Sequence, residues 1–325
     1  MGLDFTCKGV CIKTLRSLAL FFGLFFAAIV VLAFLIYRAN HNLYIEDAKN
    51  SVESVLGLTQ ELITHEKQLS LSIALMLSQN ETIKQSYLQN DRALAYTTIH
   101  AEMQKIKQIL TIEHLDIQLH TNNAHAWVRS WDFESYGEDL KPFRKGLATL
   151  RQTKLPFVSI ELGKRLNIKA LCPIFDKEDF IGSLEVIMGF DEIAAKLKEK
   201  KIDFFVLMDK ELLEIGEWMK ELEQINDFVI VNNSCGKACH ELLTSLISPQ
   251  TLQSGFARLE GFLFGFTPLF DIDAKRIGYI GIWFDASLLK ESLLLRSTLL
   301  PRTKALQTLP HEPSIPPSHT KVMIR

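Results

Sequence analysis

The sequence lacks the basic surplus of a nucleic-acid-binding protein and the many cysteines of a disulfide-built fold. Its 36 Lys and Arg residues are outnumbered by 38 Asp and Glu residues, and phosphate binding normally requires a basic surplus. Five cysteines among 325 residues are too few for a disulfide scaffold. We therefore expect no nucleic-acid partner and a fold held by apolar burial, which an apolar fraction of 47% permits.

Motifs typical of catalysis or metal binding are also missing. The sequence contains no His-Glu-x-x-His, no phosphate-binding glycine loop and no Gly-x-Ser-x-Gly. His114, His120 and His125 are close in sequence, but their spacing fits no familiar metal site, and we expect them on strand and turn surfaces. We therefore expect no enzymatic activity, no metal and no cofactor.

One segment distinguishes the chain from a wholly soluble protein. Residues 17–37 contain no charged side chain, and a helix of this length reaches about 30 Å, the hydrocarbon thickness of a bilayer. A cleaved signal peptide has an apolar stretch of about 7–15 residues and a small-x-small site, whereas this run is longer and lacks such a site. We predict an uncleaved transmembrane helix at 17–37.

Basic residues predict the orientation of this helix. Lys8, Lys13 and Arg16 precede it against one acidic residue, Asp4, so the positive-inside rule places residues 1–16 in the cytoplasm. No later stretch of about 18 apolar residues is present. We expect a single-pass membrane protein whose chain from residue 38 onward lies outside the cytoplasm.

Residues 42–78 have the pattern of one long helix. Apolar or small residues recur at steps of three and four, and no proline interrupts them. Asn80 and Asn90–Asp91 read as breaks, with a second helix ending near Leu110. We predict a stalk and spine over 38–110, and its apolar stripe favours pairing of two chains as a homodimer.

After Thr111 short apolar runs alternate with turn signals, which indicates strands. A short charged helix, 191–201, separates two sets. We expect strands at 114–120, 126–130, 157–161, 168–175 and 180–190, then at 204–208, 228–231, 256–259, 262–270 and 277–284.

The two sets share an internal pattern. Pro173-Ile174-Phe175-Asp176 precedes Ile181-Gly182, and Pro268-Leu269-Phe270-Asp271 precedes Ile277-Gly278. Phe190-Asp191 and Phe284-Asp285 each open a helix, with Asp placed as a cap. Each glycine of the Ile-Gly pairs indicates close backbone approach or a bulge. We predict an α+β fold of two successive lobes with antiparallel sheets, 111–201 and 202–290.

This architecture resembles the double Cache sensor domain of bacterial chemoreceptors and sensor kinases, over about residues 40–290. The resemblance implies that the two lobes are PAS-like. The most specific stretches are Trp127-Val128-Arg129-Ser130-Trp131, Tyr136-Gly137-Glu138-Asp139-Leu140 and Pro142-Phe143-Arg144. The resemblance implies an extracytoplasmic ligand-binding module, here in the periplasm of a bacterium, with 111–201 as the membrane-distal lobe and 202–290 as the membrane-proximal one.

The chain departs from the family pattern in two respects. Lys164 and Lys169 stand where the subgroup tends to have arginine, so positive charge is kept but a planar bidentate donor is not. Family members also normally carry a second membrane span and a cytoplasmic output domain, and the sequence shows neither. The chain therefore resembles a truncated, split or stand-alone receptor sensor.

The candidate ligand site lies in the first lobe. Trp and Tyr would supply flat walls and Arg a forked donor for a carboxylate or phosphate. A small anionic or zwitterionic metabolite is the expected ligand. The alternative is that Arg129 and Arg144 pair with Asp132, Glu138 or Asp139 and only hold the loop. The candidate ligand-binding residues are Trp127, Arg129, Trp131, Tyr136, Arg144, Lys169 and Glu185.

Cys235 and Cys239 precede His240 in a second local signal. In an oxidising compartment a short-loop disulfide is expected if the backbone turns there. Free thiols remain open, as does a variant haem attachment site, since the spacing is one residue longer than Cys-x-x-Cys-His. Cys172, on a strand, is expected in the core.

The sequence favours a membrane-anchored, extracytoplasmic small-molecule sensor of a chemotaxis-type signalling receptor. The alternatives are an anchored envelope interaction subunit without a small ligand, and a c-type haem protein. Residues 291–325 are rich in proline and polar side chains and are expected to be disordered.

Overall fold

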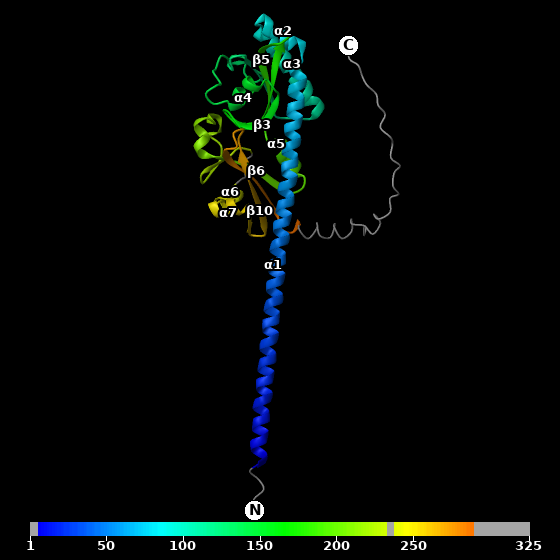
Figure 1. Cartoon of the computed structure of the whole chain (residues 1–325), viewed down its shortest axis with the longest axis vertical. Helices are drawn as coiled ribbons and strands as arrows, with labels where there is room; N and C mark the ends of the chain where they lie inside the picture. Colours follow the sequence, from blue (N-terminus) through cyan, green and yellow to red (C-terminus); the bar gives the residue numbers. More distant parts are fainter. Residues whose placement is uncertain (1–5, 233–236, 289–325) are drawn as a thin grey trace, which may run out of the picture. The chain divides into compact units, whose positions relative to one another are not determined.

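The computed structural model describes residues 6–232 and 237–288, with side chains described for 21–232 and 240–288. A long N-terminal helix is followed by two antiparallel sheets (Figure 1), which confirms the predicted α+β class. The predicted tail, the second-copy helix after Asp285 and the Cys235–Cys239 disulfide fall wholly or partly outside the described residues.

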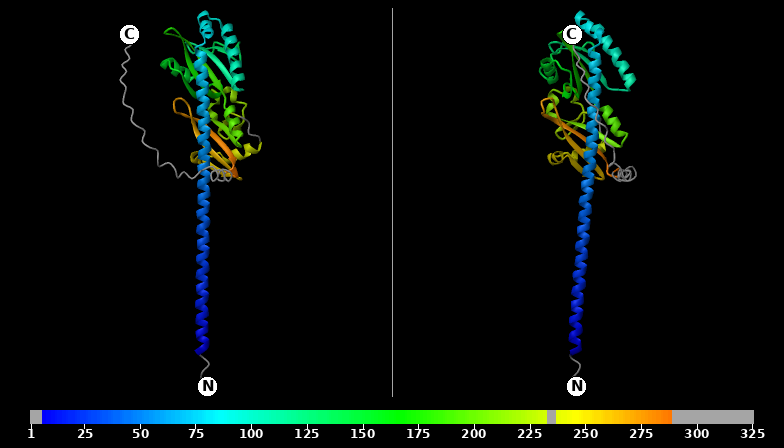
Figure 2. Two further views of the ribbon diagram at one scale, coloured as in Figure 1. Left: turned by 90° about the vertical axis from the view of Figure 1, so that its right-hand side faces the viewer. Right: turned by 45° about the vertical axis from the view of Figure 1, so that its right-hand side comes forward.

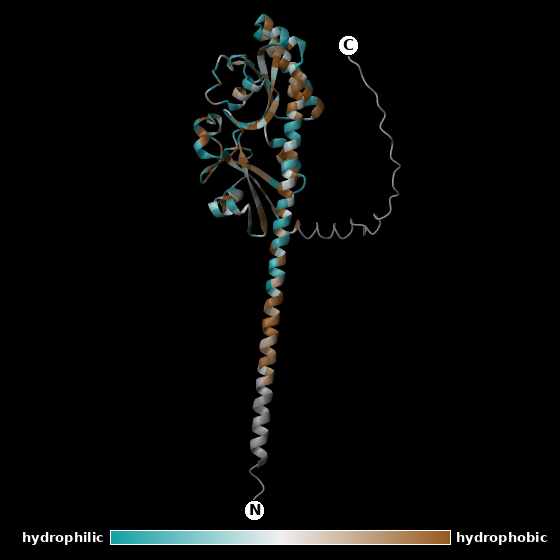
Figure 3. Ribbon diagram, in the orientation of Figure 1, coloured by the Kyte–Doolittle hydropathy of each residue, from teal (hydrophilic) through white to brown (hydrophobic). Residues whose placement is uncertain are grey.

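Helix α1, Thr6–Ser78, combines the predicted membrane span and the predicted spine in one uninterrupted helix. No glycine or proline lies between Gly23 and Gly57, so nothing in the sequence breaks the helix where it would leave a bilayer. In the described chain it is the one helix long and apolar enough to cross a membrane, and its most apolar window is wholly exposed. The apolar segment stands out in Figure 3.

Two short helices follow at the predicted breaks. Asn80 caps α2, Glu81–Gln89, by accepting hydrogen bonds from the backbone N–H groups of Thr82 and Ile83. Asp91 caps α3, Arg92–Leu110, in the same way. Asparagine and aspartate favour this position because their side-chain oxygens satisfy N–H groups that the helix leaves free.

The first sheet, sheet 1, has the strand order β2-β1-β5-β4-β3, all antiparallel. The long connection from β2 to β3 contains helix α4, Lys145–Thr153. Sequence patterning did not predict this helix. Helix α5, Asp191–Lys198, leads to the second sheet. The strands are β1 Leu115–Thr121, β2 Ala126–Arg129, β3 Phe157–Leu162, β4 Leu166–Asp176 and β5 Asp179–Met188.

The second sheet, sheet 2, has the order β7-β8-β6-β11-β10-β9. Apart from the edge strand β7, this is the order of sheet 1, with β6 in the place of β1 and β11 in the place of β5. Helices α6, Lys237–Leu246, and α7, Pro249–Ser254, are inserted before β9. The strands are β6 Ile202–Asp209, β7 Gln224–Ile225, β8 Phe228–Ile230, β9 Phe256–Leu259, β10 Phe262–Phe270 and β11 Arg276–Asp285.

The matching Ile-Gly signals occupy matching places in the two sheets. Gly182 pairs with Ile174 and Gly278 with Leu269, and each lies beside a register shift in the partner strand. A Cβ at Gly278 would lie 1.9 Å from the Leu207 carbonyl oxygen, and one at Gly182 would lie 2.5 Å from the Tyr87 ring. The predicted repeat and the predicted role of its glycines are both confirmed.

Helix α1 contacts both sheets, sheet 2 through β10 and sheet 1 through β3, β4 and β5. Val52 of α1 approaches Gly265 of β10, and the views of Figures 1 and 2 agree that sheet 1 lies farther from the N-terminal end of α1 than sheet 2. The face of sheet 1 toward α1 is apolar and buried. It includes Ile117, Leu119, Ile168, Ala170, Cys172, Leu184 and Val186.

Candidate functional site

The opposite face of sheet 1, which carries α4, is polar although it is largely buried. Strand pairing aligns its side chains in rows across β2, β1, β5, β4 and β3. Polar groups are placed in a protein interior at a cost unless they find partners there. The members of this polar face are Asp116, Gln118, His120, Arg129, Ser159, Glu161, Asn167, Lys169, Ser183 and Glu185.

Sheet 2 provides an internal comparison for this face. Gly182 and Gly278 are equivalent positions in the two sheets. Counting from them along each strand, and then across to the paired strands, aligns every position of sheet 1 with one of sheet 2. In sheet 2 the matching face is an apolar core packed on α6 and α7. Packing alone therefore does not require charge at these places. The matched residues are Gln118 and Phe205, His120 and Leu207, Lys169 and Phe264, and Glu185 and Gly281.

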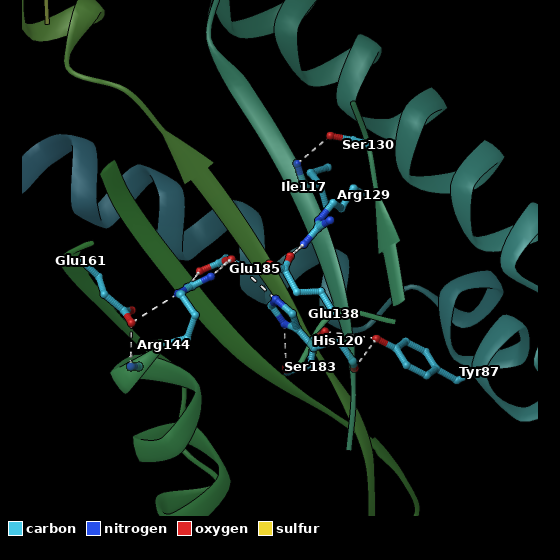
Figure 4. Close-up of polar contacts among 11 residues, drawn as sticks. Tyr87, Ile117, His120, Arg129, Ser130, Glu138, Arg144, Glu161, Ser183 and Glu185 are labelled. Atoms are coloured by element: carbon cyan, nitrogen blue, oxygen red, sulfur yellow. Dashed lines mark hydrogen bonds and ion pairs between the residues drawn. The ribbon is translucent and has the colours of Figure 1, made fainter. Parts of the chain in front are cut away.

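Arg144, immediately before α4, is the hub of the buried charges. Its guanidinium makes a two-pronged ion pair with Glu185 and a contact of 3.4 Å with Glu161, as Figure 4 shows. Burial opposes its charge, but the two carboxylates raise the pKa of Arg144 above its ordinary value. Glu161 also accepts a hydrogen bond of 2.8 Å from the Gly146 N–H at the start of α4. The cluster thus fixes α4 over the sheet.

His120 lies beside this cluster and is completely buried, which corrects the expectation of a surface histidine. Its Nδ1 shares a hydrogen bond of 3.1 Å with the Ser183 hydroxyl, and its Nε2 is 3.6 Å from a Glu185 oxygen. Burial, with the nearby charges of Arg144 and Arg129, holds the pKa of His120 well below its usual value, so the imidazole is neutral near pH 7.

Arg129 holds the loop that follows β2. Its guanidinium pairs with Glu138 and donates to the Ser135 hydroxyl and carbonyl. Glu138 is thus the partner of Arg129 among the three carboxylates that the sequence analysis offered. Its Nε is buried and has no hydrogen-bond partner. The side-chain amide nitrogen of Gln118, the cross-strand neighbour of Arg129, is also buried and unpartnered.

Lys169 is a buried cation for which the described chain shows no close ion pair, although Glu185 and Glu161 attract its charge from farther away. The residue is 3% exposed, and no contact found in the described chain joins its ammonium to an acceptor. Its Nζ lies 2.6 Å from where a Cβ at Gly163 would sit. Burial, and then the charge of Arg144, lower the pKa of Lys169 to about 8. Three donor groups on this face, from Lys169, Arg129 and Gln118, therefore have no acceptor found in the described chain.

A pocket of about 290 Å³ opens on this face. Its lining combines the unpaired donors with apolar walls and with two acidic side chains. Glu138 is paired with Arg129 and Lys164, and Asp116 has a pKa raised by burial. The lining residues are Asp116, Gln118, Arg129, Trp131, Glu138, Leu140, Phe143, Arg144, Lys164, Arg165, Asn167, Lys169, Ile187 and Trp218.

The sequence prediction of the site is partly matched by this pocket. Arg129, Trp131, Arg144 and Lys169 line it, whereas Trp127, Tyr136 and Glu185 do not. A register shift in the β1–β2 pairing makes Trp127 an extra residue, and its ring stacks on Tyr87 at 4.2 Å. Tyr136 covers the guanidinium of Arg92 instead, 3.5 Å from ring centroid to carbon. Glu185 lies behind Arg144 as its counterion.

Sequence reasoning missed several lining residues, above all Asp116, Gln118 and Trp218. The alternation of strand 114–120 was a usable signal, because it places Asp116 and Gln118 on one face with His120. No comparable signal existed for Trp218, which follows β6 and belongs to the part of the chain that builds sheet 2.

The family model described as the double sensory domain of two-component sensor kinases matches residues 45–225. The match covers more than half of the chain, so the chain belongs to the double Cache family of sensory, ligand-binding domains. A search among curated proteins finds no match.

Solved structures with a similar fold include two sensor domains. One is the ligand-binding domain of the Campylobacter jejuni chemoreceptor Tlp3 in complex with L-valine, at 17% identity, 77% coverage of this chain, 96% of that chain and a TM-score of 0.45. The other is the sensor domain of the V. cholerae histidine kinase DctB, at 12% identity, with coverages of 73% and 96% and a TM-score of 0.43.

Proposed function

We propose that this chain is a membrane-anchored extracytoplasmic sensor that binds a small carboxylate-bearing metabolite on the polar face of sheet 1. The observation that carries the proposal is the contrast between the two sheets. Where sheet 2 places Phe264 against an apolar core, sheet 1 places the buried Lys169 in a pocket without a close ion pair in the described chain. A buried charge without a partner is costly to stability, and an anionic ligand supplies the missing partner.

The chemistry of the lining narrows the ligand class. The buried, unpartnered donors of Arg129 and Gln118, together with the pocket-lining ammonium of Lys169, suit an acceptor-rich group such as a carboxylate. Trp131, Leu140 and Phe143 suit a short apolar body. A zwitterion would place its carboxylate toward Lys169 and its ammonium toward Asp116, which lies in the same cross-strand row.

A thermal-shift experiment on the full chain in detergent micelles tests the proposal. The probes are pyruvate, succinate and L-valine, with putrescine as a cationic control. A ligand at 100 times its dissociation constant stabilises the folded state by about 2.7 kcal/mol, so a binding carboxylate should raise Tm clearly in wild type and not in Lys169→Met. The matched control, Lys177→Met, alters an exposed lysine and should behave as wild type.

Two outcomes would overturn the ligand proposal. One is that no carboxylate shifts Tm, which would favour an anchored interaction subunit without a small ligand. The other is a shift that Lys169→Met leaves intact, which would move the ligand away from this pocket. A visible absorption spectrum of the same sample checks the haem alternative.

The membrane topology and signalling context belong to the same proposal. Helix α1 begins with an apolar segment suited to span a bilayer, and its basic N-terminal flank supports a cytoplasmic N-terminus. With 38–110 as stalk and spine, the lobe of 111–201 is membrane-distal and that of 202–290 membrane-proximal. Two stalks pairing as a homodimer would carry the signal, in a chemotaxis or sensor-kinase pathway.

A further inference from the structure

A segment of the second lobe, residues 210–219, has no counterpart in the first. In sheet 1 residues 122–125 join β1 to β2, whereas the matching strands of sheet 2, β6 and β8, are separated by residues 210–227. The extra chain begins with two 3₁₀ turns, Lys210–Glu214 and Glu217–Met219. An insertion confined to one copy of a repeat is not needed to build the repeated sheet, so its contacts indicate another purpose.

These contacts are made with the first lobe, at the turn between β3 and β4. The Trp218 N–H donates to the Lys164 carbonyl at 3.2 Å, and the Lys164 ammonium lies 3.0 Å from a Glu217 oxygen. The Leu166 N–H is 3.5 Å from the Met219 sulfur, and Met219 is completely buried. The segment is therefore docked by backbone, charge and apolar contacts together.

The same turn forms one side of the pocket. Lys164 and Arg165 line it, and so does Trp218 from the docked segment. The Trp218 ring centroid lies 5.5 Å from the Lys164 Nζ and 6.0 Å from the Arg165 guanidinium carbon. Trp218 remains 46% exposed, so part of its ring is free to contact a bound molecule.

We propose that the 210–219 segment is a wall of the ligand pocket, with Trp218 as a ligand-contacting, specificity-determining residue and the Lys164–Glu217 ion pair as the latch that holds it. A ligand seated on sheet 1 then touches both lobes, and its body size is read by Trp218. Ligand contact by Trp218 rests on the proposed function of the pocket, whereas closure of the pocket by the segment is independent of it.

Lys169 is a built-in reporter of pocket closure. Its neutral amine attacks 2,4,6-trinitrobenzenesulfonate, forming a carbon–nitrogen bond as sulfite leaves and a proton is lost. The bulky anion must pass the wall to reach Lys169, while the exposed Lys177 serves as an internal reference. The full chain in micelles is labelled at pH 8, and mass spectrometry of peptides gives the ratio of Lys169 to Lys177 labelling.

We expect Trp218→Ala and Glu217→Gln each to raise this ratio at least about fivefold, because the first removes the wall and the second loosens its latch. Glu214→Gln changes a carboxylate of the same segment that makes no contact with sheet 1 in the described chain and should leave the ratio unchanged. An unchanged ratio in both Trp218→Ala and Glu217→Gln overturns the closure claim, whatever binds in the pocket.

The ligand contact is tested by affinity for pyruvate, succinate and L-valine. We expect Trp218→Leu to weaken binding of L-valine more than that of pyruvate, since the larger body reaches the wall, with Glu214→Gln at wild-type affinity. Equal affinities in wild type and Trp218→Leu overturn the specificity role. If none of the probes binds wild type, the proposed function fails, and the labelling ratio still decides whether the segment closes the pocket.

Discussion

At the scale of residues, buried Lys169 should lower the stability of the unliganded chain and favour the proposed binding of a carboxylate. The change of its pKa from 10.5 to about 8 corresponds to a cost of up to about 3 kcal/mol near pH 7, since one pKa unit is about 1.36 kcal/mol. We predict that Lys169→Met raises the unfolding free energy of the unliganded chain by about 1–3 kcal/mol and abolishes carboxylate binding. Thermal unfolding and calorimetric titration measure the two effects, and a fall in both quantities would mark Lys169 as a structural residue.

The same lysine predicts a pH dependence. Between pH 8 and 10.5 the unfolded chain binds the Lys169 proton more than the folded chain does, so this residue makes stability rise with pH in that window. Carboxylate affinity should instead fall, by about tenfold per pH unit above pH 8, because the amine becomes neutral. Titrations at pH 7, 8 and 9 measure this fall in wild type and in the control Lys177→Met, which should show the same profile. A flat wild-type profile would remove Lys169 from the binding site.

At the scale of elements, a strand glycine and a helix glycine differ in whether they tolerate a side chain. A Cβ at Gly278 would meet the Leu207 carbonyl at 1.9 Å, and its φ is +156°, whereas a Cβ at Gly57 in α1 meets nothing within 4 Å. We predict that Gly278→Ala costs about 2 kcal/mol or more and that Gly57→Ala stabilises by up to about 1 kcal/mol. Denaturant unfolding of both variants decides, and a neutral Gly278→Ala would contradict the bulge assignment.

The elements with strong local signals were predictable from sequence, and those shaped by tertiary context were not. Alternation and turn residues locate nearly every main strand, and Asn80 and Asp91 mark helix starts because they cap them. Helix α4 begins at Lys145, and Arg144 at its N-cap position makes no capping side-chain hydrogen bond. The start of the helix is held instead by Glu161 and Glu185 from distant strands. Likewise, the bulge that turns Trp127 to Tyr87 depends on a pairing that local sequence does not encode.

At the scale of the whole chain up to Ala286, α1 is the element that both sheets share. It meets β10 of sheet 2 and then β3, β4 and β5 of sheet 1. In the proposed function the two faces of sheet 1 have separate roles: the polar face would receive the ligand, and the apolar face packs on helix α1. A ligand that contacts both sheet 1 and the 210–219 segment would move sheet 1 relative to sheet 2. Because both sheets pack on α1, such a movement would favour one of two arrangements of the sheets on this helix.

Glu66 lies on this shared helix with its side chain 2% exposed, and its one ion pair found in the described chain is with Lys196 of α5 at 3.8 Å. Burial raises the pKa of Glu66 more than Lys196 lowers it. The folded chain thus binds this proton more tightly than the unfolded chain, and stability is lost as pH rises above about 4.5 through the folded pKa.

We predict that Glu66→Gln raises Tm at pH 7 and raises it less at pH 4.5, because the raised pKa leaves folded Glu66 more protonated at the lower pH. Glu61→Gln, an exposed glutamate of the same helix, is the matched control and should change Tm little at either pH. Equal effects at both pH values would show that the amide acts through packing and not through charge. The expected difference would show that ionised Glu66 lowers the stability of the folded chain. This residue lies where α1 meets α5, the helix that connects the two sheets.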